Sequence, residues 1–311
     1  MSRLSLPLRG LWRALALSAP LVLIGCSDDQ QSEVSTSAAE QPAEQVGVPP
    51  VVPESLSVPV QPPSEPAVPA QPASESEPEP EPELPPLVAA PALPRLAIII
   101  DDVGQSLAVG RRVVALPGPV ALAILPFLPH SQALADEAAA AGKPVMLHLP
   151  MENMGGLSIG PGGLTTSMPE AEYRSRVQQA LNAFSPIQGV NNHMGSRLTA
   201  DRQRMDWLMQ LLAERQLFFV DSRTTAETQA AFAAEAAQVP SVSRDVFLDN
   251  QRSETEIDHE FALVVAKARE EGAAVLIGHP YPETLRYLER RLPQLEGEGV
   301  QLVSVQALLG Q

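Results

Sequence analysis

From Arg95 onward, short apolar runs alternate with longer segments in which apolar residues recur at helical spacing. The runs predicted to be strands are 96–100, 120–125, 145–149, 189–192, 217–220, 245–248, 273–277 and 302–305. Amphipathic helices are predicted over 173–184, 201–216 and 255–271, and Ser167 with Glu170 has the spacing of a capping box before the first. Apolar strands separated by helices are typical of a parallel sheet covered by helices. Seven or eight such units predict an α/β fold, a distorted (β/α)7–8 barrel, with an open doubly wound sheet as the alternative.

The composition is different before this region. Residues 27–94 contain 12 acidic residues, no Lys or Arg, and 17 of the 32 prolines in the chain. Proline removes backbone donors and like charges repel, so this stretch cannot bury a core. We expect a disordered Pro/Glu-rich linker over 27–94 that acts as a tether, the alternative being a proline-rich ligand for a partner domain. The folded domain is predicted over 95–311.

Residues 1–26 have the pattern of a signal peptide. Three arginines precede a largely apolar stretch from Ala14 to Ile24, which is shorter than the ~20 residues of a confident transmembrane span. The sequence Leu23-Ile24-Gly25-Cys26 resembles the lipobox of bacterial lipoproteins, with Cys26 as the lipidated residue. We therefore expect a lipoprotein in the bacterial periplasm that meets the membrane through its N-terminus only, with Ser27 favouring the outer membrane. An ordinary signal peptide and an uncleaved anchor are the alternatives.

Polar side chains follow the predicted strands, at the end where parallel β/α folds carry their chemistry. They are Asp101-Asp102, His148, Asn191-Asn192-His193, Asp221 with Arg223, Asp249-Asn250 and His279. Taken singly, these residues could cap a helix, form an ion pair or make turns. Their shared position instead predicts one site. Adjacent carboxylates repel unless a cation lies beside them, and a carboxylate with His nitrogens suits a divalent ion of the zinc type.

Several classes of protein are disfavoured. Residues 95–311 carry 25 acidic and 18 basic residues, and the lack of a basic patch argues against a nucleic-acid partner. The single cysteine excludes a disulfide framework and a Cys-rich metal site. There is no His-Glu-x-x-His motif and no strand–turn–helix nucleophile elbow of the Gly-x-Ser-x-Gly kind, and the glycines of 155–163 lack dinucleotide-site spacing. We expect those glycines to form a flexible loop over the end of the third strand.

The strand-end motifs together resemble one known family. They are Ile98-Ile99-Ile100-Asp101-Asp102-Val103-Gly104, Leu147-His148-Leu149-Pro150-Met151-Glu152, Asn191-Asn192-His193-Met194-Gly195-Ser196, Val220-Asp221-Ser222-Arg223-Thr224, Arg244-Asp245-Val246-Phe247-Leu248-Asp249 and Ile277-Gly278-His279-Pro280. This pattern is similar to the divergent polysaccharide deacetylases, a branch of the NodB-like carbohydrate deacetylase superfamily. The resemblance implies a distorted barrel and metal-dependent deacetylation of an acetylated polysaccharide or peptidoglycan. It also implies that Asp101 is the general base, Asp102 a metal ligand and His279 the general acid.

The sequence departs from that superfamily in its histidines. The superfamily has two metal-binding histidines four residues apart on one loop, and this sequence has no such pair. We assign His148 and His193, from neighbouring strand ends, as the remaining ligands of a zinc ion. Asp221, Arg223 and Asn192 are expected to support the site. The predicted function is metal-dependent deacetylation of a cell-envelope polysaccharide; the alternative is a catalytically inactive glycan-binding or envelope-assembly lipoprotein that retains the fold.

Overall fold

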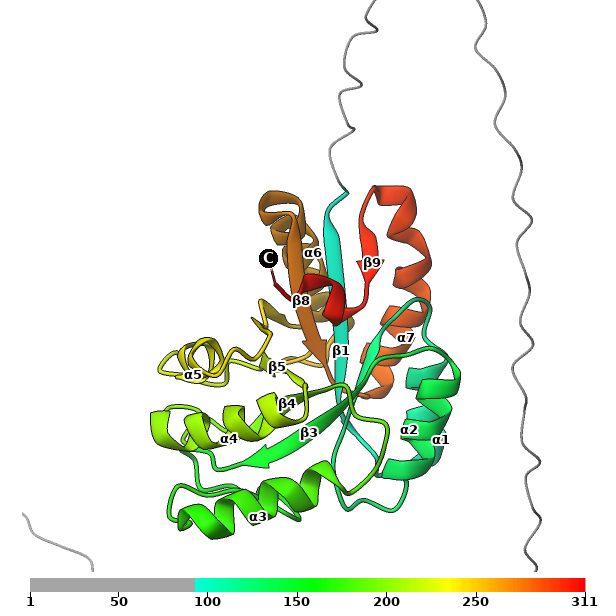
Figure 1. The fold of residues 1–311 in the computed structure, drawn as a ribbon. Helices are drawn as coiled ribbons and strands as arrows, with labels where there is room; N and C mark the ends of the chain where they lie inside the picture. The colour runs from blue at the N-terminus through cyan, green and yellow to red at the C-terminus, as the bar shows by residue number, and fades with distance from the viewer. Residues whose placement is uncertain (1–92, 311) are drawn as a thin grey trace, which may run out of the picture. The chain divides into compact units, whose positions relative to one another are not determined.

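The computed structural model describes residues 93–310 (Figure 1). Cys26, the signal segment and nearly all of the predicted linker lie outside these residues. The strands are β1 (Arg95–Val103), β2 (Ala121–Ile124), β3 (Val145–Met151), β4 (Gly189–Met194), β5 (Phe218–Asp221), β6 (Ser241–Ser243), β7 (Val246–Phe247), β8 (Ala273–Gly278) and β9 (Gln301–Val303). The α-helices are α1 (Leu107–Val114), α2 (Ser131–Ala140), α3 (Glu170–Leu181), α4 (Arg202–Glu214), α5 (Ala230–Ala236), α6 (Glu254–Glu271) and α7 (Pro282–Arg291). Across the described part of the chain, helices fall short of the length and hydropathy that a membrane span requires.

The strands form one parallel sheet in the order β6-β5-β4-β3-β2-β1-β8-β7. The short strand β9 pairs with the first half of β1, where Arg95 lies opposite Gln301, while β2 pairs with its second half. All eight predicted strands are present with shifted ends. The additional strand β6 is short, half-buried and contains two serines, so it lacks the apolar run that identifies the others.

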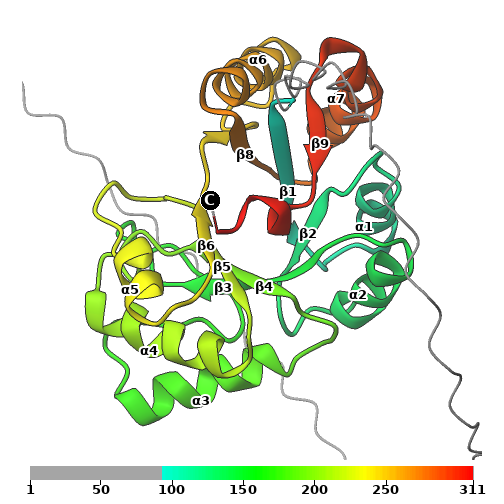
Figure 2. The same ribbon diagram turned by 45° about the horizontal axis from the view of Figure 1, so that its top comes forward.

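The sheet curls, so that alternate residues of each strand face two different cores. In β1, Leu96 and Ile98 pack outward among residues of the surrounding helices. Ala97 and Ile99 point inward and meet residues of β2, β3, β5, β8 and the 3-10 helix η3 (Val305–Leu308). The inner cluster contains no α-helical residue, and the α-helices surround the outside of the sheet (Figure 2). This arrangement confirms the predicted distorted barrel and excludes a doubly wound sheet, which would have helices on both faces.

The two end strands of the sheet, β6 and β7, are separated by only Arg244 and Asp245. The backbone N–H of Arg244 donates to the carbonyl of Asp221 in β5, at 2.9 Å. The N–H of Asp245 donates to the carbonyl of Val275 in β8, also at 2.9 Å. The chain therefore crosses directly from one edge of the sheet to the other.

Helix starts follow local capping chemistry, with one departure from expectation. The side chains of Asp201 and Ser253 accept backbone N–H groups at the starts of α4 and α6. The predicted capping box before α3 is wrong, because the N-cap is Pro169 and the Ser167 hydroxyl contacts that of Thr165 at 3.0 Å. The helix after the Asp pair begins at the N-cap Ser106. Neither aspartate is therefore used as a helix cap.

Candidate metal centre and its surroundings

The two adjacent aspartates reach the same space because the backbone breaks the alternation of β1. Asp101 continues the inward direction of Ala97 and Ile99, and Asp102 would by alternation point outward. Instead, Asp102 has a φ of 57°, and the register with β2 shifts between Ile100 and Val103. Asp tolerates this left-handed region better than most residues, at a cost of roughly 1 kcal/mol. Both carboxylates then lie near one nitrogen, His148 Nε2, at 3.7 Å for Asp101 and 3.2 Å for Asp102.

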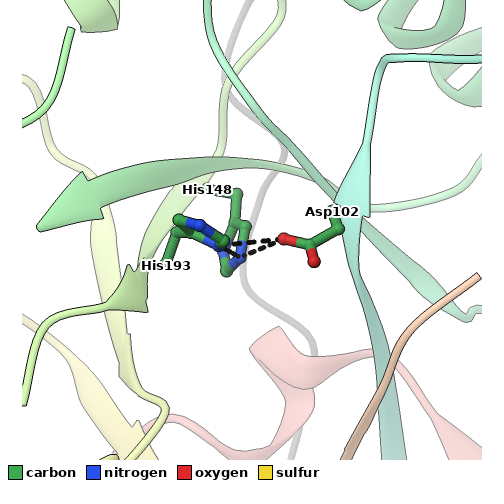
Figure 3. Close-up of side chains that lie close together, drawn as sticks. All are labelled: Asp102, His148 and His193. Carbon is green, nitrogen blue, oxygen red and sulfur yellow. Dashed lines mark hydrogen bonds and ion pairs between the residues drawn. The ribbon is translucent and has the colours of Figure 1, made fainter. Parts of the chain in front are cut away.

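Three side chains from three strands converge on one point (Figure 3). Asp102 Oδ1 lies 3.2 Å from His148 Nε2 and 2.9 Å from His193 Nδ1. The two histidine nitrogens are 3.1 Å apart. His148 is on β3 and His193 is on the neighbouring β4, so the strand pairing itself brings the two rings together.

The triangle fits a divalent ion. Tetrahedral zinc with oxygen and nitrogen ligands at about 2.0–2.2 Å has neighbouring ligand atoms about 3.3 Å apart, close to the three distances here. Asp102 Oδ1 is shielded from solvent and has no hydrogen bond of good geometry, although two ring nitrogens lie within 3.2 Å. An acceptor left in that state is destabilising unless a cation joins it. Three protein ligands would also leave a fourth position for water or substrate.

The electrostatics of these groups favour a cation. Burial raises the pKa of Asp102, but the contacts with His148 and His193 outweigh it and hold that pKa well below its usual range. Burial lowers the pKa of His148, but the charges of Asp101 and Asp102 outweigh that effect and raise it. Without a metal, the two carboxylates favour the protonated form of His148. A divalent ion would displace that proton.

Asn191 fixes which nitrogen of His148 is free. Its Nδ2 donates to Asp101 Oδ1 at 2.7 Å, and a carboxylate only accepts, so the amide oxygen must face the imidazole. That oxygen lies 2.8 Å from His148 Nδ1, which therefore carries the hydrogen. His148 Nε2 is left with the lone pair that a metal requires. Asn191 was among the polar residues placed at the strand ends but was given no role; the usable signal for one was its position two residues before His193, on the same face of one strand.

Asp101 itself is buried at the base of the site. Burial raises its pKa, against the opposing effects of His148, His279 and the hydrogen bond from Asn191. With Oδ1 occupied by Asn191, Oδ2 is the oxygen that remains available. A carboxylate with a raised pKa is a stronger proton acceptor than one exposed to water.

His279 is held by the buried carboxylate of Asp249, which was among the polar residues placed at the strand ends but was given no role. Its Nδ1 lies 2.8 Å from Asp249 Oδ1, and its backbone N–H donates to Asp249 Oδ2 at 2.7 Å. The Thr284 hydroxyl donates to the same Oδ2. Burial lowers the pKa of His279, but the bond to Asp249 and the charge of Asp101 outweigh it and raise the pKa to about 9. Asp249 is thus a positioning residue, and its place after a strand was the only signal for it.

Replacing Asp249 is expected to change how stability depends on pH. In metal-free protein, the raised pKa of His279 stabilises the fold fully below an unfolded-state value of about 6.5, and this stabilisation is lost as pH rises through about 9. The contribution is on the order of 2 kcal/mol once partial exposure of the ring is allowed for. Asp249→Asn should lower the His279 pKa and flatten the unfolding free energy between these pH values. NMR titration and denaturant unfolding measure both, with Asp258→Asn as the control; an unchanged His279 pKa would refute this.

The residues expected to support the site brace its loops from outside. Asn192 lies two residues after Val190 in β4, and Asp221 two residues after Phe219 in β5. Both therefore point to the outer face of the sheet, as Val190 and Phe219 do. Asn192 Oδ1 accepts the backbone N–H of Ser222 at 2.9 Å, and Asp221 Oδ1 accepts that of Arg223 at 2.8 Å. Asp221 and Arg223 form no side-chain ion pair in the described structure, because their contact is made by the backbone.

Comparison with known proteins places the chain among related sequences. Residues 98–309 match the model of a family described as divergent polysaccharide deacetylase. An uncharacterized protein of Haemophilus influenzae is 38% identical over 211 residues, covering 68% of this chain and 75% of that one. The uncharacterized protein YibQ of Escherichia coli is 35% identical over 217 residues, covering 70% and 68%. The crystal structure of an uncharacterized Agrobacterium tumefaciens protein superposes with a TM-score of 0.68 at 25% identity, covering 72% and 92%.

Proposed function

Because the chain belongs to the divergent polysaccharide deacetylase family, we propose that it is a zinc-dependent hydrolase that removes acetyl groups from an acetylated cell-envelope polysaccharide. The observation that carries the proposal is the triangle of Asp102, His148 and His193 beside the buried Asp101. Three ligands with an open position are the arrangement of catalytic rather than structural zinc sites.

Each side chain then has one task. Asp102 Oδ1, His148 Nε2 and His193 Nδ1 would hold the ion, which when bound would act as a Lewis acid toward water and the acetyl carbonyl. Asp101 Oδ2 accepts the proton of the attacking water. His279 is protonated at neutral pH, and with Nδ1 engaged by Asp249 it donates from Nε2 to the leaving nitrogen or oxygen. The raised pKa of His279 keeps this acid form populated at neutral pH.

The test is metal content together with acetate release. The purified full chain should contain about one divalent ion and release acetate from chitooligosaccharides, peptidoglycan fragments or acetylated acidic glycans. His148→Ala combined with His193→Ala removes both nitrogen ligands and should abolish metal binding and release together. Absence of metal under metal-replete conditions contradicts the proposal. Metal and glycan binding without any acetate release supports the inactive glycan-binding protein instead.

Asn191 provides a second measurement that does not depend on turnover. Asn191→Leu removes the acceptor that fixes the His148 tautomer, so the affinity of the metal-free protein for zinc should fall about 10- to 100-fold. Asn191→Asp keeps an acceptor at that position and, although it loses the donor to Asp101 as the Leu variant does, should retain more of the affinity than Asn191→Leu. Competition with a chromogenic chelator measures both. Equal affinities for the two variants would show that Asn191 does not position the ligand.

We also propose that the protein is a periplasmic lipoprotein attached through Cys26, because of the sequence that resembles a lipobox. Cys26→Ala should leave the precursor unprocessed or release the protein from the membrane fraction. Fractionation and mobility of the variant measure this. Behaviour identical to that of the parent would contradict lipidation.

A further inference from the structure

Three arginines near the site lack the carboxylate partner that most of the described arginines have. Every arginine in α1, α3, α4 and α7 has a nitrogen within 3.5 Å of a carboxylate oxygen. Arg223, Arg244 and Arg252 form no such ion pair within the described residues. They follow β5, β6 and β7, so they lie at the carboxyl ends of the strands, where the metal ligands are. In a domain of net charge −7, three arginines without a direct carboxylate contact thus share one end of the sheet, with Asp221 and Glu283 near enough for their charges to interact.

Arg244 and Arg223 are held close together by the loop. The Arg244 guanidinium donates to the carbonyls of Ser222 at 2.7 Å and Arg223 at 2.9 Å. Burial and the neighbouring charge of Arg223 both lower the pKa of Arg244. Arg223 has a φ of 46°, stabilised by Asp221, which accepts its N–H. The fold therefore holds two like charges near each other, only partly offset by the charges of Asp221 and Asp245, and a bound anion would reduce their repulsion.

Aromatic rings connect these arginines to His279. The guanidinium carbon of Arg244 lies 3.8 Å from the centroid of the Phe247 ring. The Phe247 ring stacks on the ring of His279, with centroids 6.1 Å apart and an angle of 24° between the planes. A second aromatic ring, that of Tyr281, has its centroid 5.5 Å from the centroid of the His279 ring. The guanidinium carbon of Arg252 lies 3.8 Å from the centroid of the Tyr281 ring. The proposed proton donor thus has two aromatic neighbours, each covered by a guanidinium. Guanidinium groups match the planar geometry of carboxylates, and aromatic rings offer an apolar surface to a sugar ring.

We infer that the substrate is an acidic sugar whose carboxylate binds the Arg223, Arg244 and Arg252 group beside the reacting acetyl group. This inference rests on the proposed function and adds its substrate class. A neutral glycan would leave all three guanidiniums without a carboxylate partner. The carboxylate could belong to a uronic acid or to the lactyl group of muramic acid, since both present the same planar anion.

Binding measurements on the metal-loaded full chain test the inference. Calorimetry would compare three oligosaccharides: an acetylated polyuronate, a disaccharide of N-acetylglucosamine with N-acetylmuramic acid, and a neutral chitooligosaccharide of similar length. At least one acidic ligand should bind about tenfold more tightly than the neutral one, and this preference should weaken at higher salt. The acidic ligand that binds more tightly identifies the source of the carboxylate.

The variants assign the preference to the arginines. Arg223→Ala and Arg252→Ala should each reduce the ratio of acidic to neutral affinity by about tenfold. The exposed Arg252 makes no hydrogen bond in the described structure, so its removal should leave the fold intact. Arg269→Ala is the matched control, because this α6 arginine also lacks a carboxylate partner but contacts the Glu298 carbonyl.

The outcomes separate the two proposals. Equal affinity for acidic and neutral ligands, or a ratio unchanged in both variants, overturns the inference. If neutral glycans also release acetate as fast as acidic ones, the inference fails while the hydrolase stands. Preferential, arginine-dependent binding of acidic glycans without acetate release keeps the inference and removes the hydrolase.

Discussion

Asp101→Asn is expected to lower acetate release by about 10²- to 10⁴-fold while the protein keeps its metal ion and its fold. The amide cannot take the proton of the attacking water. Its oxygen can still accept the hydrogen bond from Asn191 Nδ2, so His148 keeps its tautomer. Because Asp101 is buried and its pKa is raised, removing its charge should also not destabilise the domain.

This substitution separates a base from a ligand. Turnover would be measured together with metal content and unfolding free energy, and Asp136→Asn, on the exposed face of α2, is the control. Retained metal with lost turnover supports proton transfer by Asp101. Turnover within a few-fold of the parent would remove Asp101 from the mechanism, and loss of the metal would make it a ligand instead.

His279→Ala is expected to lower the rate by about 10²-fold or more on an acetyl amide. An activated ester should lose much less, because its leaving group departs without a proton. The split between the two substrates is therefore the signature of a general acid. His259→Ala, an exposed histidine of α6, should behave like the parent on both. An equal loss on both substrates would indicate that His279 acts on binding or structure.

The fold was largely predictable because buried parallel strands have a strong sequence signal. The alternation of apolar runs and amphipathic segments located eight strands and predicted the barrel. It did not locate β6, which pairs only with β5 and is half-buried. The helices α1, α5 and α7 were not among those predicted, and in α5 the seven residues are mostly alanine and show no amphipathic contrast.

The site was predictable to the extent that strand ends meet at one edge. That rule brought together Asp102, His148 and His193, and strand alternation could also have placed Asn191 inward and Asn192 outward. Asp102 follows the strand-end rule but not the alternation, because its direction depends on a positive φ that the sequence does not specify. The contact between Asp249 and His279 joins two strand ends 30 residues apart, and no spacing predicts it.

The position of β1 in the sheet has a kinetic consequence. Arg95 pairs with Ala273 in β8 and Gln301 in β9, so the earliest strand of the domain depends on two of the latest. Each pairing closes a loop of well over a hundred residues before any stabilising contact is gained, and sheets dominated by such distant contacts fold slowly. Until β8 and β9 have formed, β1 keeps an open, almost wholly apolar edge. We therefore expect this domain to have a long-lived unfolded state in which aggregation competes with folding.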